Sequence, residues 1–125
     1  MYEIDQQTIR FSNGKKHCFP AAVVEAIDFE ESIVVRLAET HPLILQNVVG
    51  IDYQGKFLWN IPMPRSFRPQ NPYVCLYRKG NYVEVLSWDG HIVTLLPKQG
   101  TIVGEDFYSG GVGHSRRTAS TRVWI

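Results

Sequence analysis

Glycine-containing turns punctuate this chain, and from residue 80 onward they recur about every ten residues, a spacing typical of folds built from short β-strands. The turn pairs are Asn13-Gly14, Gln54-Gly55, Gly80-Asn81, Asp89-Gly90 and Gln99-Gly100. Runs rich in Val, Ile, Leu, Tyr, Phe and Trp separate these pairs. Asn-Gly and Asp-Gly favour tight hairpin turns because these residues tolerate positive φ angles. The rhythm of turns and apolar runs therefore predicts an all-β fold.

We predict a single-domain antiparallel meander that closes into a barrel or sandwich of about eight short strands. The chain has 125 residues, of which 44% are apolar and 20% charged, as in ordinary one-domain proteins. We expect the domain to cover residues 1–108. A Gly/Ser/Arg-rich tail, residues 109–125, follows it and ends in a candidate terminal strand, Arg122–Ile125. For residues 21–29, a helix beginning after Pro20 remains an alternative to a strand.

One strand of the meander is apolar on both sides. In Tyr82–Ser87, alternation places Val83 and Val85 on one face. The other face carries Tyr82 and Leu86, so we expect this strand to be central or covered on both sides. Two tryptophans beside hairpins, Trp59 and Trp88, are predicted to lie in the core. The cysteines, Cys18 and Cys75, are expected to be reduced and buried.

Charge is divided unevenly along the chain. Residues 1–60 hold 8 acidic and 5 basic groups, a net of −3, whereas residues 61–125 hold 4 acidic and 8 basic groups, a net of +4. Such asymmetry is typical of a surface with two charged poles. Four prolines fall within residues 62–72, and these predict an extended loop, since proline lacks the backbone donor of a central strand.

Two segments are candidate partner-binding surfaces. The first is the acidic segment with Glu25, Asp28, Glu30 and Glu31, which would meet a basic partner. The second is the proline-rich loop, which carries Arg65, Phe67 and Arg68. Long loops of this kind are often functional. These residues predict a module that binds another protein.

Two further motifs resemble those of a family of small bacterial all-β proteins. The first runs from Asn47 to Ile61, where Asn-Val begins a strand, Gly55-Lys56 forms a turn and Leu58-Trp59-Asn60-Ile61 forms the next strand. The second joins the Trp88-Asp89-Gly90 turn to the Lys98-Gln99-Gly100 turn. The resemblance covers Thr8 to Phe107. Some members of that family are similar to immunity proteins, which block a cognate toxin. The resemblance implies a binding module without naming its target, and a cognate toxin is the sharper hypothesis for the protein partner.

The sequence offers no catalytic constellation, and we expect neither an enzyme nor a bound cofactor or metal. The four histidines, His17, His41, His91 and His114, show no metal-ligand spacing. The glycines of residues 110–113 lack the Gly-Lys-Ser/Thr end of a phosphate-binding loop. No apolar run is long enough for a membrane helix, and the first five residues lack signal-peptide character, so we expect a cytoplasmic protein with no membrane partner.

An alternative function is binding of nucleic acid by a β-barrel. Segment 65–79 mixes the basic residues Arg65, Arg68, Arg78 and Lys79 with aromatic residues, as surfaces for single strands do. The net charge of +1 is low for such a protein, so nucleic acid is not the expected partner. Open sheet edges also leave room for a homodimer formed by pairing of edge strands.

Overall fold

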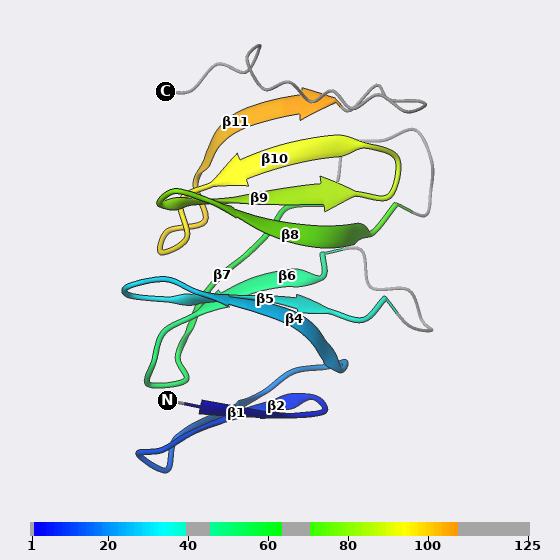
Figure 1. Cartoon of the computed structure of the whole chain (residues 1–125). Coiled ribbons are helices and arrows are strands. Elements are labelled where there is room, and N and C mark those ends of the chain that lie inside the picture. Colours follow the sequence, from blue (N-terminus) through cyan, green and yellow to red (C-terminus); the bar gives the residue numbers. More distant parts are fainter. Residues whose placement is uncertain (1, 40–45, 64–70, 108–125) are drawn as a thin grey trace.

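The computed structural model of the protein describes residues 2–39, 46–63 and 71–107, and this part of the chain is all-β (Figure 1). Its eleven strands are β1 (Tyr2–Asp5), β2 (Thr8–Phe11), β3 (Lys16–Cys18), β4 (Val23–Asp28), β5 (Ile33–Leu37), β6 (Val48–Ile51), β7 (Phe57–Asn60), β8 (Tyr73–Lys79), β9 (Tyr82–Ser87), β10 (His91–Leu95) and β11 (Ile102–Phe107). In the same part of the chain, no helix is suited to crossing a membrane.

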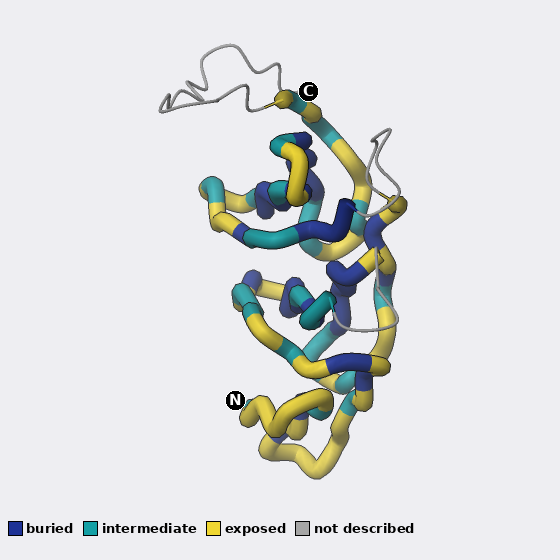
Figure 2. Tube along the Cα trace, turned by 90° about the vertical axis from the view of Figure 1, so that its right-hand side faces the viewer, coloured by how far each residue is buried: buried dark blue, intermediate teal, exposed yellow. Residues whose placement is uncertain are grey.

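The strands form three separate antiparallel sheets, each built from consecutive strands. The N-terminal sheet has the order β1-β2-β3, the middle sheet β4-β5-β6-β7 and the C-terminal sheet β8-β9-β10-β11. Figures 1 and 2 show them as successive layers of a stack, with the middle sheet between the other two. The predicted all-β class is confirmed.

The predicted closure and strand number are wrong. None of these sheets closes into a barrel, and the described residues alone form eleven strands rather than about eight. A two-layer sandwich encloses one core, whereas this stack encloses two apolar clusters, one on each side of the middle sheet. The extra strands include Tyr2–Asp5, whose residues are half-buried or exposed and therefore give a weak apolar pattern.

Strand β5 explains why the middle sheet is covered on both faces. Ile33, Val35 and Leu37 belong to the cluster shared with the N-terminal sheet. Val34, which points the opposite way, belongs to the cluster shared with the C-terminal sheet. All four are buried almost completely. A strand that is apolar at successive positions requires cover on both sides, and the stack supplies it.

Two of the predicted hairpin turns have the same geometry. Gly14 N donates to Phe11 O while Phe11 N donates to Lys15 O, and this pattern recurs where Gly55 N donates to Asp52 O. Both glycines have positive φ angles, 91° and 80°. Glycine reaches this region without the steric cost of a Cβ, which is why the sequence signal for these hairpins is strong.

The helix considered for residues 21–29 does not form. Val23–Asp28 is strand β4, paired with β5 from Val23↔Leu37 to Asp28↔Ile33. A register shift between Val23 and Glu25 interrupts this pairing, and bulges of this kind protect edge strands. Pairing with the apolar β5 thus overrides the local preference of Ala and Glu for a helix.

A buried amide joins the middle and C-terminal sheets. The Nδ2 group of Asn47 donates to Leu37 O and to Tyr73 O, both at 2.9 Å. Its Oδ1 accepts from Tyr73 N at 3.0 Å. Asn47 is 0% exposed, so these bonds replace water completely. The start of β8 is therefore fixed to the end of β5 by directional bonds.

The indole of Trp59 forms a second tie between these sheets. It lies against Gly50 and Gly100, where an added Cβ would approach its atoms to 2.2 Å and 2.5 Å. Its Nε1 donates to Pro97 O at 2.8 Å. Trp59 is buried as predicted, but Trp88 is 58% exposed. Trp88 follows β9 at the Asp89-Gly90 turn, where the strand has ended and no layer covers it.

Candidate partner-binding surface

The acidic turn, defined as residues 28–32 between β4 and β5, is held by residues from all three sheets. Tyr2 of β1 donates its hydroxyl to Asp28 Oδ1. Arg78 of β8 donates to Asp28 O, and its guanidinium lies 4.2 Å from the centre of the Phe29 ring. Charge and aromatic face attract each other in this arrangement. The turn thus occupies the place where the layers meet.

Further hydrogen bonds fix the backbone of the acidic turn. Tyr53, in the turn between β6 and β7, donates its hydroxyl to Phe29 O at 2.6 Å. Ser32 Oγ donates to Pro97 O at 2.9 Å, and Phe29 N donates to Ser32 O at 2.8 Å. Phe29 and Ser32 are buried, 8% and 1% exposed. The turn is therefore fixed by its buried members, while its acidic side chains remain outside.

The charges of the acidic turn face solvent. Asp28, Glu30 and Glu31 are exposed. Lys98 Nζ lies 2.5 Å from Glu31 Oε1, and this hydrogen bond, with the attraction between the charges, raises the pKa of Lys98. Burial, followed by the hydrogen bond and charge of Asp28, raises the pKa of Tyr2, which keeps this hydroxyl a donor across the physiological range. Two basic groups, Arg78 and Lys98, thus border the acidic side chains.

Glu25 plays a different part from the other acidic candidates. Its Oε1 accepts from Arg36 Nε at 2.6 Å and from Leu76 N at 3.2 Å. Arg36 also lies 3.6 Å from Glu39. Glu25 therefore links the edge strands of the middle and C-terminal sheets. The other candidates in the proline-rich loop, Arg65, Phe67 and Arg68, lie outside the residues that the structure describes.

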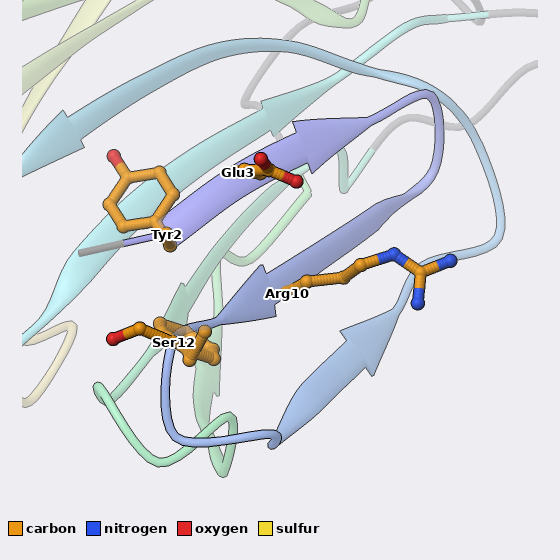
Figure 3. A pocket seen from close by; sticks show the side chains of 5 residues that line it. Tyr2, Glu3, Arg10 and Ser12 are labelled. Atoms are coloured by element: carbon orange, nitrogen blue, oxygen red, sulfur yellow. The ribbon is translucent and has the colours of Figure 1, made fainter.

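A shallow hollow of about 390 Å³ lies on the N-terminal sheet, and sequence reasoning did not identify it. It is lined by Tyr2, Glu3, Arg10, Phe11 and Ser12 (Figure 3). Glu3 and Arg10 are cross-strand partners, as are Tyr2 and Phe11. The rings of Tyr2 and Phe11 meet edge to face with centroids 6.0 Å apart. Only the pairing of β1 with β2 brings these residues together, so no motif marks them.

A polar cluster surrounds the turn between β9 and β10. His91 Nε2 lies 2.9 Å from Glu105 Oε1, and the ring stacks on Phe107 at 4.6 Å. Ser87 Oγ donates to Asp89 Oδ1 at 2.9 Å and accepts from His91 N at 3.1 Å. Because the Ser87 hydroxyl is bonded to the backbone of His91 across the turn, the cluster stabilises the hairpin between β9 and β10. Within the described residues, no three His, Cys, Asp or Glu side chains gather as metal ligands do.

The two cysteines differ from expectation in their exposure. Both are free thiols, but Cys18 is exposed and Cys75 is half-buried. Cys18 ends the edge strand β3, where nothing in the stack covers it.

Comparison with known proteins gives a family and no function. No curated protein matches the sequence. Residues 1–107 match the family model described as "Domain of unknown function (DUF7957)". That match spans most of the chain and includes every strand described above. The chain therefore belongs to the DUF7957 family.

Proposed function

We propose that this protein is a small protein-binding module that presents its acidic turn to a basic surface on a partner. The observation that carries the proposal is the contrast within the turn. Tyr53 and Arg78 hold its backbone and Tyr2 holds the Asp28 side chain, one residue from each sheet or its turns, while Glu30 and Glu31 stay exposed. A loop fixed before binding loses little conformational freedom on association, which favours affinity. Its charges steer the encounter and set specificity.

The resemblance to immunity proteins sharpens this proposal. In that case the partner is a cognate bacterial toxin in the cytoplasm, and the module blocks the toxin's active site without any catalysis of its own. A rigid acidic projection suits a cleft lined with basic residues, because complementary charge raises the association rate. Arg65, Phe67 and Arg68 of the proline-rich loop remain the alternative proposed contacts with the partner.

Nucleic acid binding through segment 65–79 has less support. Two of its basic residues already have partners within the protein: Arg78 donates to Asp28 O, and Lys79 lies 3.6 Å from Glu84. A phosphate would have to compete with both contacts. Tyr73 is 2% exposed and cannot serve as a stacking platform for a base.

The test is capture of partners by the tagged full-length protein and by a variant with Glu30→Lys and Glu31→Lys. The matched control is Glu3→Lys with Asp5→Lys, which makes the same change of charge at two exposed positions of β1. We expect one stoichiometric protein to be retained by the wild type and by the control, and to be lost with the turn variant. Co-expression with a suspected toxin then compares growth for the same three proteins.

Two results would overturn the proposal. Retention of the partner by the turn variant at wild-type level would remove the acidic turn from the interface. Recovery of nucleic acid, with an affinity that falls steeply as salt rises, would favour the alternative function. Unchanged toxicity with wild-type protein present would dismiss the immunity hypothesis for that toxin.

A further inference from the structure

The face of the C-terminal sheet that points away from the middle sheet is buried, although neither apolar cluster includes it. Ile92 is 4% exposed, Thr94 0% and Glu84 3%. Among the buried apolar residues that the structure describes, Ile92 alone lies outside both clusters. Its neighbours Val93 and Leu95 point the other way, toward the middle sheet. The cover over Ile92 is therefore distinct from the stacked sheets.

Cross-strand register identifies the residues around Ile92, since antiparallel partners share one face of their sheet. Ile92 pairs with Leu86 on one side and with Asp106 on the other, and Thr94 pairs with Glu84. The outward face, as we name it, consists of Cys75, Glu84, Leu86, Ile92, Thr94 and Asp106. Its centre is apolar and it carries two carboxylates. Sequence alternation in Tyr82–Ser87 predicted a strand that is covered on both sides, and β9 has buried residues on both faces.

We propose that the outward face is the docking surface for the chain's own C-terminal segment, residues 108–125. The segment begins where β11 ends, at Phe107, which pairs with His91 beside Ile92. Eighteen residues follow Phe107. An extended chain of that length reaches roughly 60 Å, whereas four strands span only about 15 Å. The segment is thus attached next to the surface and long enough to cover it.

The chemistry of the two partners is complementary. The segment contains Arg116, Arg117 and Arg122 and no acidic residue. It ends in Val123, Trp124 and Ile125, which supply apolar surface. The outward face offers Ile92 and Leu86 for the apolar end. Its carboxylates, Glu84 and Asp106, provide negative charge for the arginines, in addition to the contacts of Glu84 with Lys79 and of Asp106 with Phe107 N. Covering an apolar centre while pairing charges at its margin is the usual design of a specific interface.

Residues 64–70 are a weaker candidate for the cover over Ile92. Residues 64–70 follow Ile61 and Pro62, which lie on the inner side of the sheet: Ile61 belongs to the cluster between the sheets, and Tyr73 donates its hydroxyl to Pro62 O at 3.0 Å. The described chain that precedes residues 64–70 therefore lies on the side opposite to Ile92. Residues 64–70 also contain the two basic residues Arg65 and Arg68 but only Phe67 as a large apolar side chain.

Cys75 lies on the outward face and provides a direct test. In a Cys18→Ser background of the full chain, the rate at which a small thiol reagent labels Cys75 reports how often the face is uncovered. Replacing Val123, Trp124 and Ile125 with serine removes the apolar end. We expect labelling to become at least about tenfold faster, which corresponds to a docking free energy of about 1.4 kcal/mol. Replacing Arg116, Arg117 and Arg122 with glutamate should accelerate labelling as well.

The matched control replaces Ser115 and Thr118 with alanine, and its rate should equal that of the background. Circular dichroism must first show that every variant keeps its β-structure. Equal labelling rates in all variants would overturn the proposal, because the segment would then not protect Cys75. Protection that increases with protein concentration would also overturn it, since the cover would then be a second copy of the chain.

Discussion

The two faces of the middle sheet are joined to their neighbours by different means. Toward the C-terminal sheet, the apolar cluster is accompanied by hydrogen bonds from interior side chains, those of Asn47 and Trp59. Toward the N-terminal sheet, the cluster formed around Ile9 and Ile33 is apolar, and its side-chain hydrogen bonds lie near the rim. Tyr2 donates to Asp28 at an exposed position, and His17 Nδ1 lies 3.0 Å from Gly55 O at a half-buried one.

This difference teaches how a stack of sheets is positioned. Apolar contact is not directional and tolerates small shifts of one layer over another. A buried amide that serves Leu37 and Tyr73 at once accepts only one arrangement, because an unsatisfied buried group is costly. The middle and C-terminal sheets should therefore form one rigid unit, to which the N-terminal sheet adds apolar area.

The largest loss of stability is expected from a substitution at Asn47, which would remove the directional bonds between the middle and C-terminal sheets. Asn47→Ala removes three hydrogen bonds and leaves buried groups of Leu37 and Tyr73 unsatisfied, so we expect a loss of about 4 kcal/mol in unfolding free energy. Urea denaturation measures this loss. The matched control is Asn60→Ala, whose Nδ2 donates to Gln46 O and Val48 O nearer the surface. Equal losses in the two variants would contradict the special position of Asn47.

The face of the middle sheet that packs against the N-terminal sheet can be tested with Ile9→Ala. Ile9 is 0% exposed, and deleting its side-chain atoms should cost about 3 kcal/mol. Hydrogen exchange then shows where the loss falls. If the N-terminal sheet is an added layer, amides of β2 exchange much faster in the variant while those of β9 and β10 keep their protection. Uniform acceleration over all three sheets would mean that the layers unfold together.

A smaller effect is expected from Gly50→Ala. The new Cβ would lie 2.2 Å from Trp59 Nε1, and the indole cannot retreat without giving up its bond to Pro97. Overpacking of this kind costs about 2 kcal/mol. Gly80→Ala serves as a control, because Gly80, unlike Gly50, has open space for a Cβ, so its positive φ of 62° makes backbone strain the only cost. Thermal unfolding followed by tryptophan fluorescence should show altered Trp59 surroundings in the first variant alone.

The smallest effect concerns alkaline pH. Burial raises the pKa of Tyr73 above its ordinary value, and the charge of Glu105 adds to the rise. The unfolded chain therefore releases this proton at a lower pH than the folded chain. The contribution of Tyr73 to the free energy of unfolding is complete well below pH 10 and declines as the pH rises. At pH 10 about 0.4 kcal/mol of it is already lost. Tyr73→Phe lowers stability at neutral pH through loss of the bond to Pro62 O, but it should reduce the alkaline decline. An unchanged decline would assign it to other groups.

The sequence was sufficient to predict the local elements of this fold. Gly14 and Gly55 mark hairpins because their positive φ angles are a local requirement. The stacking order could not be derived in the same way. The run Ile33–Leu37 requires cover on both faces, but apolar side chains do not specify which strands provide it.

The candidate site was predictable to a similar extent. A run of acidic residues identified the turn between β4 and β5, because solvated charges are usual in turns. The spacing did not reveal that the half-buried Glu25 bonds Arg36 and Leu76, since that contact depends on how two edge strands meet. The contacts of Arg78 with Asp28, fifty residues away in the sequence, and with the ring of Phe29 likewise result from the stacking of the sheets.

Because each sheet consists of consecutive strands, the order of the layers also has a consequence for synthesis of the protein. Pairing within a sheet joins neighbouring stretches of chain, so each layer can form as soon as its own segment has left the ribosome. The middle sheet is complete at Asn60, but Val34 and Val48 stay uncovered until the strands from Tyr73 to Phe107 follow. During that interval the nascent chain exposes the apolar face of a finished sheet, which makes this the stage most open to aggregation or to a chaperone.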